Sequence, residues 1–518
     1  MQPQQSGLQR LTVEIPADTE PAGYARLIID HNLVVLAPSS LTFIANKWKR
    51  QTIVSGRTKI RVFPPSYDPG PVWCDQLEFA LKYDGIDLQV LAAFFQTIDR
   101  LTFEDELCRR IAARPGGANL RRIWFLYEFL TGRLLTIDDG AAMHFEPLLD
   151  PAAYYTAAGV RSRRHHIINN LPGNSDFCPL VRRTARLAEF EATDLSAEAS
   201  AILAEFDADA IRRATTWLYT KETRSSFDIE GEHPSSTRAD RFVNMLKTLP
   251  GLPELTDMDL LRLQNATVDP RYADTGYRTT QVYVGERLNL TSQKIHFIGA
   301  RPQDVPALMN GLLKCLSTAK GSGINPVVLA AAIAFGFVFI HPFNDGNGRL
   351  HRMLIHYILS RMGFTPDGLI FPVSAVMLAR RNEYDATLES FSAPLMRVID
   401  YDEDDRGVVT VRNDTAHMYR YFDATPLAEA LYGWVQETIR ADFRQELTFI
   451  VTFRELRKSL TQIVDMPDMK ADLLLKLCLQ NHGRLSASKR RSQFPELTDA
   501  EIAEIESLVG KHLDAFEP

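Results

Sequence analysis

A twelve-residue segment, His341 to Arg352, gathers side chains that are suited to phosphate chemistry. It reads His-Pro-Phe-Asn-Asp-Gly-Asn-Gly-Arg-Leu-His-Arg. His341 can accept a proton near neutral pH and so act as a general base on a hydroxyl group. Asp345 offers a hard carboxylate, which Mg²⁺ takes as a ligand when it also keeps waters and substrate phosphates. Arg349 and Arg352 lie three residues apart, so on a helix they share one face and each can bind phosphate oxygens.

The glycines of this segment add a backbone contribution. A Gly-Asn-Gly turn that opens a helix points backbone N–H groups outward, and it lets a ligand approach because no Cβ atoms stand in the way. Gly346, Asn347 and Gly348 therefore predict a phosphate-binding loop. Each residue taken singly also has an ordinary interpretation, since lone histidines, Asp-Gly turns and paired arginines are common structural features. The ordered set favours the functional interpretation.

Two predicted helices must position this loop. Residues Asn325 to Ile340 are almost wholly apolar, with a proline near the start, which is typical of a buried helix. The run is shorter than the roughly 20 apolar residues that a membrane span needs. Residues Arg349 to Met362 carry apolar side chains at the spacing of a half-buried helix. These are Leu350, Met353, Leu354, Tyr357, Ile358 and Met362.

The segment resembles the signature of Fic-domain enzymes, His-Pro-Phe-x-(Asp/Glu)-Gly-Asn-Gly-Arg-x-x-Arg, at every fixed position. Members of that family typically transfer AMP from ATP to a Ser, Thr or Tyr hydroxyl of a target protein. The resemblance implies that His341 deprotonates the hydroxyl and that Asp345 holds Mg²⁺. It also implies that ATP is the donor, although relatives that use UTP-type or CDP-choline donors carry similar loops.

The same resemblance assigns the other residues of the loop. The backbone of Gly346 to Gly348, with Asn347, would cradle the α and β phosphates. Arg349 would contact the β-phosphate and Arg352 the γ-phosphate, while Phe343 would pack beneath the loop and fix it. The kinase-like Doc branch replaces the second glycine with lysine, so Gly348 argues against that branch.

A second motif lies upstream. Ser225-Ser226-Phe227-Asp228-Ile229-Glu230-Gly231 resembles the inhibitory motif (Ser/Thr)-x-x-x-Glu-(Gly/Asn), with Ser226, Glu230 and Gly231 at the fixed positions. The pattern predicts a helix over Asp209 to Glu230 that ends at Gly231. The resemblance implies that Glu230 pairs with Arg352 and occupies the room that the γ-phosphate needs. The alternative is that Glu230 is an ordinary surface carboxylate.

The composition is that of a soluble globular protein with several domains. The 518 residues are 45% apolar and 24% charged, and the net charge is −7 at pH 7, so no global charge favours nucleic acid. The five cysteines show no Cys-x-x-Cys spacing, which predicts reduced thiols. The N-terminus lacks the pattern of a signal peptide, so we expect a cytoplasmic address and no membrane partner.

We expect a mainly α fold that is organised around a Fic-type helical core. The predicted order is an N-terminal α/β domain (1–139), a connector (140–186), the Fic core (187–395), a linker hairpin (396–415) and a C-terminal helical, winged-helix-like module (416–518). The core would include the inhibitory helix (about 209–231) and a β-hairpin flap (about 276–300). Local patterns also predict a strand at Leu33–Leu36, a core position at Leu101 and a helix at Ala375–Glu389.

The predicted function is an autoinhibited protein adenylyltransferase. In the family the flap holds the target segment by strand addition, which is tolerant of sequence. Self-modification and a homodimer are open. Two alternatives remain: removal of AMP, with Glu230 positioning water, or a DNA- or protein-binding regulator with residual Fic activity. Basic runs at Arg161–His166 and Lys489–Arg491 could contact nucleic acid, but structural contacts are favoured.

Overall fold

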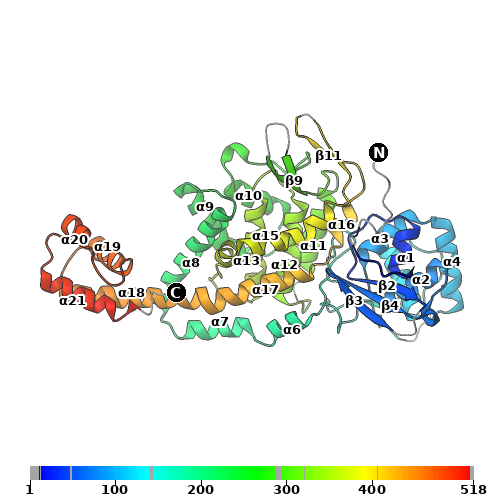
Figure 1. The fold of residues 1–518 in the computed structure, drawn as a ribbon, viewed down its shortest axis with the longest axis horizontal. Coiled ribbons are helices and arrows are strands. Elements are labelled where there is room, and N and C mark those ends of the chain that lie inside the picture. The colour runs from blue at the N-terminus through cyan, green and yellow to red at the C-terminus, as the bar shows by residue number, and fades with distance from the viewer. Residues whose placement is uncertain are drawn as a thin grey trace. The chain divides into compact units, whose positions relative to one another are not determined.

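The computed structural model describes residues 11, 13–46, 50–140, 144–287, 293–319, 321–404 and 406–513. It is mainly helical, as predicted (Figure 1). The chain forms two compact units, each assembled from separate segments. The first unit comprises Met1–Phe190, Pro234–Met362 and Arg380–Tyr432, and the second Glu191–His233, Gly363–Ala379 and Gly433–Pro518. The domain boundaries expected from the sequence stay predictions.

The N-terminal part of the first unit is an α/β structure. Its sheet has the order β1-β2-β4-β3, in which β2 and β4 are parallel and the other pairs antiparallel. All six residues of β2 are buried, because helices cover it. The strands are β1 (Thr19–Ala22), β2 (Ser40–Ala45), β3 (Gln51–Ser55) and β4 (Thr58–Phe63). The helices are α1 (Tyr24–Asp30), α2 (Trp73–Tyr83), α3 (Leu88–Thr97), α4 (Arg100–Ala113) and α5 (Ala118–Thr131), with a short turn η2 (Pro65–Tyr67).

Two local predictions in this part are wrong. Leu33–Leu36 is not a strand: Leu33 and Val35 are buried, but the Leu36 N–H donates to the Gln89 side chain instead of a neighbouring strand. Leu101 is 66% exposed, because α4 turns Phe103 and other residues towards the core. Apolar side chains in short segments do not by themselves specify a partner.

The basic run at Arg161–His166 makes a structural contact within the first unit. It spans the turn between β6 (Val160–Ser162) and β7 (Ile167–Asn169), which form a small sheet with β5 (Glu146–Pro147). Arg164 Nη2 lies 2.9 Å from Glu128 Oε1, and His165 Nε2 lies 2.9 Å from Glu128 Oε2. Glu128 is itself buried on α5, so these residues tie the small sheet to that helix.

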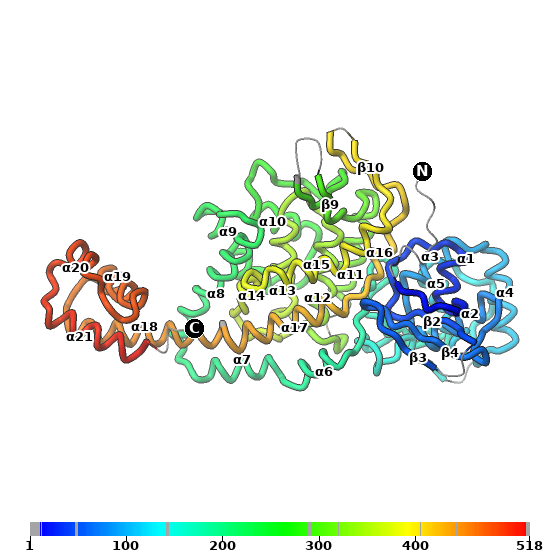
Figure 2. Tube along the Cα trace, viewed as in Figure 1, coloured from blue at the N-terminus to red at the C-terminus, as the bar shows by residue number. Residues whose placement is uncertain are grey.

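The helical core of the first unit surrounds α12 (Pro326–Ile340). Every residue from Val327 to Ile340 is buried, and Asn325 caps the helix by accepting the Val327 N–H. α12 packs along α13 (Asn347–Arg361), so both predicted helices are confirmed (Figure 2). The other helices are α9 (Ser236–Thr248), α10 (Asp257–Thr267), α11 (Val305–Ala319), α15 (Arg381–Leu395) and α16 (Ala416–Arg420), with turns η3 (Leu249–Gly251) and η4 (Pro270–Tyr272). α6 (Ala185–Glu191) and α17 (Thr425–Glu437) cross the boundaries between the units.

Two hairpins complete the first unit. The predicted flap is present as β8 (Tyr283–Arg287) and β9 (Gln293–Ile298), which pair antiparallel. Residues 288–292 of the flap lie outside the described residues. β10 (Tyr401–Glu403) and β11 (Val409–Val411) form the second hairpin, within the linker expected at 396–415.

The second unit is helical. It contains α7 (Leu195–Ala204), α8 (Ala208–Ile229), α14 (Val373–Ala379), the π-helical stretch η5 (Thr438–Phe443), α18 (Arg444–Ile463), α19 (Asp468–Leu479), α20 (Ala487–Gln493) and α21 (Asp499–Gly510). The helix expected at Ala375–Glu389 is wrong as a single element, because α14 ends before Arg380 and α15 begins at Arg381, in the other unit. No helix among the described residues is long and apolar enough to span a membrane.

The C-terminal segment differs in one respect from the expected winged-helix likeness. Its described residues, 416–513, contain helices and no strand, so they lack a wing. The capping box predicted from Thr498 and Glu501 is present at the start of α21. Arg490 in the basic run pairs with Asp499 at 2.5 Å, which supports the structural interpretation of that run. Binding of nucleic acid by this segment stays the less favoured alternative.

Candidate active site

His341 directly follows α12, and the residue after it, Pro342, influences which ring nitrogen of His341 carries the proton. Pro342 has no N–H, so it cannot donate to the Val338 carbonyl four residues earlier. The His341 ring takes that place, with Nδ1 3.0 Å from the Val338 oxygen. A carbonyl oxygen can only accept, so in the neutral ring Nδ1 carries the proton and Nε2 the lone pair. His341 is thus held in the tautomer whose Nε2 can take up a proton.

The loop after His341 is held by its own side chains. Asn347 Oδ1 accepts the Phe343 N–H at 3.0 Å, and Asn347 Nδ2 donates to the Phe343 carbonyl at 2.9 Å. The Asn347 amide therefore fixes the loop, and any contact with a phosphate would use the backbone N–H of Asn347. The Phe343 ring is fully buried beside Tyr277 and Phe337, with centroids 5.5 and 6.4 Å away, which suits its predicted supporting role.

Gly346 is required by its conformation and its surroundings. Its φ is 88°, and a Cβ there would lie 3.1 Å from Thr267 Oγ1 and 3.2 Å from Val268 Cγ1. α13 begins at Asn347, so the N–H groups of Asn347 and Gly348 belong to the first helical turn, where no acceptor within the helix is available. This geometry favours an anion at the start of α13.

Asp345 and Arg349 pair with each other in this structure. Arg349 Nη2 lies 2.9 Å from Asp345 Oδ1, and the same oxygen accepts the Gly346 N–H at 2.6 Å. Arg349 is 1% exposed, whereas the Asp345 side chain is 46% exposed. Arg349 Nη1 also donates to the Thr267 carbonyl at 3.3 Å. The cation is thus fixed beneath the loop while the carboxylate reaches solvent.

The donor set fits a magnesium ion that depends on a bound nucleotide. Mg²⁺ commonly binds through one or two carboxylates together with waters and substrate phosphates. Asp345 supplies one accessible carboxylate beside the anion-binding turn. No group of three or more His, Cys, Asp or Glu residues that could hold a metal occurs among the described residues. A metal at Asp345 would therefore need oxygen ligands from the phosphates.

Arg352 lies one turn further along α13 and is 1% exposed. Its Nη1 donates to the hydroxyl of Tyr384, on α15, at 3.4 Å. Arg352 and Arg349 thus project from one helix, as their spacing predicted, but each is directed by groups from other elements.

Arg278 is a supporting residue that the sequence did not reveal. It is 3% exposed and lies between the flap and the loop. Its guanidinium donates to the carbonyls of His341 (2.6 Å), Thr280 (2.7 Å), Ile340 (3.3 Å) and Ala300, and its backbone N–H donates to the Pro342 carbonyl (2.9 Å). Burial lowers the pKa of Arg278 to about 10, which leaves it charged at neutral pH. No local sequence pattern predicts this role, because Arg278 lies 63 residues before His341, whose carbonyl it contacts.

Two further residues hold the outer side of the loop. Asp274 accepts the Asn344 backbone N–H at 3.0 Å and its side-chain amide at 2.7 Å. Gln264, fully buried on α10, donates to the Asp345 carbonyl and to Asp274, both at 3.3 Å. These contacts also come from distant segments and carry no motif.

Replacing Arg278 with methionine is expected to lower the free energy of unfolding by about 3–5 kcal/mol, because several buried carbonyls lose their donor. Urea unfolding followed by circular dichroism measures this loss. Arg271→Met is the matched control, since Arg271 is 79% exposed in its side chain and pairs only at the surface with Asp269; its effect should stay within about 0.5 kcal/mol. Equal losses in the two variants would contradict the role of Arg278.

The flap lies against His341 at its base. The Ala300 N–H donates to the Ile340 carbonyl at 3.2 Å, and a Cβ on Gly299 would lie 3.0 Å from the His341 Cβ. The flap is also braced by the β10–β11 hairpin, because Gln293 Nε2 donates to Glu403 Oε1 at 2.6 Å. Glu403, at the end of β10, thus joins the two hairpins.

The residues of the predicted inhibitory motif lie at the C-terminal end of α8. Ser226 is fully buried, Glu230 is the exposed C-cap, and Gly231 has a φ of 68° that terminates the helix. α8 is anchored in the second unit, where Glu222 accepts the Ser374 N–H at 3.0 Å and Lys221 pairs with Glu446 at 2.8 Å. Arg352 belongs to the first unit. The pairing of Glu230 with Arg352 stays a prediction.

Comparisons with known proteins identify the segment that carries the loop. The profile of the Fic/DOC family matches residues 254–359. Protein adenylyltransferase fic-1 of Caenorhabditis elegans is 32% identical over 151 residues, which cover 29% of this chain and 26% of that protein. Protein adenylyltransferase Fic of Nematostella vectensis is 36% identical over 90 residues, covering 17% of this chain and 19% of that protein. The match thus spans about a quarter or less of these curated relatives.

Solved structures give a looser likeness. A Fic family protein from Desulfovibrio desulfuricans aligns over 64% of this chain and 86% of that chain, with 17% identity and a TM-score of 0.37. Fic-1 (aa134–508) from C. elegans covers 74% of this chain and 94% of that chain, with 17% identity and a TM-score of 0.35. Residues 254–359 of this chain form a Fic/DOC-family domain.

Proposed function

We propose that this protein transfers AMP from ATP to a side-chain hydroxyl of a target protein. The observation that carries the proposal is the arrangement at the start of α13: His341 is held with Nε2 as the basic nitrogen, next to a glycine turn and two buried arginines. The adenylyltransferase names of the matched relatives point the same way.

The reaction follows from these groups. His341 Nε2 takes the proton from the target hydroxyl, whose oxygen then attacks the α-phosphorus of ATP. The bond between that phosphorus and the bridging oxygen breaks, and pyrophosphate leaves. Such transfers ask the protein mainly for positioning and charge stabilisation. The N–H groups of Asn347 and Gly348 and the guanidinium of Arg349 supply both. Mg²⁺, held by Asp345, would neutralise phosphate charge when bound.

The activity is restrained, in our proposal, by Glu230. Arg352 would bind the γ-phosphate of a productive ATP, and Glu230 would compete for it. The 1% exposure of Arg352 supports this idea, because a phosphate could reach the guanidinium only if the groups that cover it moved. The target segment would add to the flap as a further strand, which places its hydroxyl near His341. A cytoplasmic location is part of the proposal and is supported by five free cysteines.

The position of the label in ATP provides the test. The full chain is incubated with a cell extract and with ATP labelled on either the α- or the γ-phosphate. Relative to the same extract with the His341→Ala chain, we expect weak additional incorporation of the α label into protein and no additional γ label, and mass spectrometry of the labelled protein identifies the modified hydroxyl. Additional incorporation of the γ label would indicate a kinase, and no additional incorporation of either label, with Glu230→Gly as well, would refute the proposal.

A further inference from the structure

A second charged site lies in the N-terminal part of the first unit, whose function the sequence left open. It is a cavity of about 390 Å³, between strand β4, the end of α2, helix α5 and the segment before α6. Its cationic lining residues are Lys59, Arg61, Lys82, Arg122, Arg182 and Arg183. A volume of this size is typical of sites for small molecules, which occupy roughly 300–1,000 Å³.

The charge of this cavity contrasts with that of the whole chain. Six cationic side chains line it, and only two acidic ones, Asp84 and Asp150. The chain as a whole carries −7 at pH 7. Burial also raises the pKa of Asp84 to about 7, so that carboxyl group is partly protonated at neutral pH. A concentration of positive charge in a concave site attracts and holds anions.

Arg182 pairs with Asp423 at 2.6 Å, so its charge is compensated, whereas Arg61 and Arg122 are oriented by carbonyl groups. Arg61 Nη1 donates to the Tyr83 carbonyl, and Arg122 donates to the Pro147 carbonyl at 3.0 and 3.1 Å. Throughout the part of the chain that the structure describes, neither Arg61 nor Arg122 has a carboxylate within ion-pair distance, and the same holds for Lys59 and Lys82. Their charges therefore remain available to a ligand.

A structural ion pair in the same domain shows the contrast. Arg110, on α4, pairs with Asp75 at 2.5 Å and with Glu106 at 2.7 Å. Two carboxylates therefore compensate its charge. Arg61 and Arg122 have carbonyl partners instead, which orient a guanidinium but leave its charge intact.

The cations also converge from separate elements. Lys59 and Arg61 lie two residues apart on β4, so they share one face of the strand. Lys82 is in the last turn of α2, and Arg122 comes from α5. We propose that this cavity binds a compact organic polyphosphate, whose phosphate oxygens contact Lys59, Arg61, Lys82 and Arg122.

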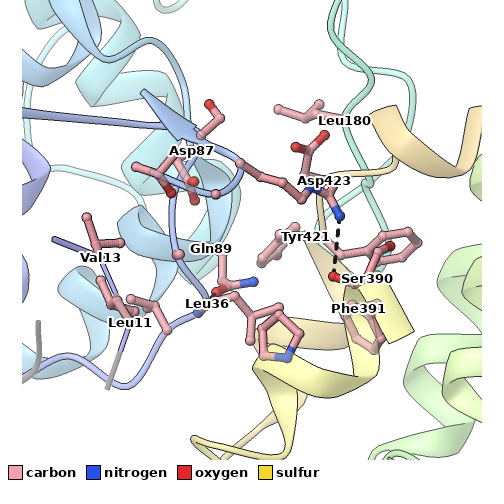
Figure 3. Close-up of a pocket in the computed structure, with 18 of the residues that line it drawn as sticks. Leu11, Val13, Leu36, Asp87, Gln89, Leu180, Ser390, Phe391, Tyr421 and Asp423 are labelled. Carbon is pink, nitrogen blue, oxygen red and sulfur yellow. Dashed lines mark hydrogen bonds between the residues drawn. The ribbon is translucent and has the colours of Figure 1, made fainter. Parts of the chain in front are cut away.

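An adjoining cavity can receive the organic part of such a ligand. It has a volume of about 290 Å³ and shares Tyr154 and Arg182 with the basic cavity. Leu11, Val13 and Leu36 line one side, and Phe391 and Tyr421 the other (Figure 3). Its walls are thus more apolar than those of the basic cavity, which fits a nonpolar or aromatic group attached to the phosphates.

Calorimetric titration of the full chain with inorganic triphosphate tests the site. Lys59→Glu combined with Lys82→Glu should weaken binding about tenfold or more, because two attractive charges become repulsive. Lys314→Glu combined with Lys476→Glu is the control, since it changes the net charge equally at exposed positions that do not line the cavity. We expect the control to bind within about twofold of the native chain. The milder Lys59→Ala with Lys82→Ala should weaken binding less, and thermal unfolding checks that every variant folds.

Equal affinities in the cavity variant and its control, or no saturable binding, would overturn the proposal. A second titration uses a nucleoside triphosphate, and tighter binding than that of inorganic triphosphate would support an organic group in the adjoining cavity. A third uses a single-stranded oligonucleotide; if it binds more tightly than either and is lost in the cavity variant, the site serves nucleic acid and the small-molecule proposal fails. Triphosphate bound at the loop of α13 contributes equally to variant and control. The proposal for the basic cavity can therefore be refuted without refuting the AMP-transferase proposal, and the reverse is also true.

Discussion

Alanine in place of His341 is expected to lower the rate of AMP transfer by about 10²–10⁴-fold, because the target hydroxyl loses its general base. ATP affinity should change little, since the phosphate contacts come from the N–H groups at the start of α13 and from the arginines. Initial rates of incorporation of α-labelled ATP measure the first effect, and equilibrium dialysis with ATP measures the second.

His144→Ala is the control for this variant. The His144 side chain is 71% exposed and pairs with Glu146 in the N-terminal part, away from the loop. Its replacement should leave the rate of transfer unchanged. A His341→Ala chain that keeps more than about a tenth of the native rate would show that another group removes the proton, because even a modest general base contributes more than that.

Glycine in place of Glu230 is expected to raise the rate of AMP transfer by about tenfold or more. The reason is that Glu230 would compete with the γ-phosphate for Arg352. If the Glu230–Arg352 interaction contributes only about 1.4 kcal/mol, it lowers the fraction of ATP that is bound productively about tenfold. Glu230 is exposed at the end of α8, so its replacement should not disturb packing. Rates of α-label incorporation at fixed ATP, with native and variant chains side by side, measure the change.

Glu232→Gly is the matched control, because it removes a carboxylate two residues further along the same turn. It should leave the rate near the native value. An inactive Glu230→Gly chain would contradict autoinhibition by Glu230. If Glu230 instead positions water for removal of AMP, a modified protein should release AMP with the native chain and not with the Glu230→Gly chain, which separates that alternative from inhibition.

Several features of the site could be predicted from the sequence because they are encoded locally. α12 and α13 follow from continuous or periodic apolar side chains, and the turn between them follows from its glycines. Pro342 has a local effect as well, because it has no N–H to donate to the Val338 carbonyl. That carbonyl therefore accepts a hydrogen bond from the His341 ring. The end of α8 at Gly231 was likewise set by the conformational freedom of glycine.

Other features depended on contacts between residues that are far apart in the chain. Arg278, Asp274 and Gln264 hold the loop, yet each lies 60 or more residues before its partner and has no pattern of its own. Only the fold shows that the Asn347 amide is used within the loop, or that Leu101 faces solvent.

By itself, the sequence determined which groups lie together in one short segment, namely a histidine, a carboxylate, a glycine turn and two arginines, together with the helices on either side. The tertiary structure alone decided how these groups are held, and it brought together the basic cavity of the N-terminal part from four elements. The physical reason is the distance along the chain over which each kind of interaction acts. Helix periodicity, capping and turn conformation act over a few residues, whereas the partner of a buried guanidinium or carboxylate is chosen by packing across the whole chain.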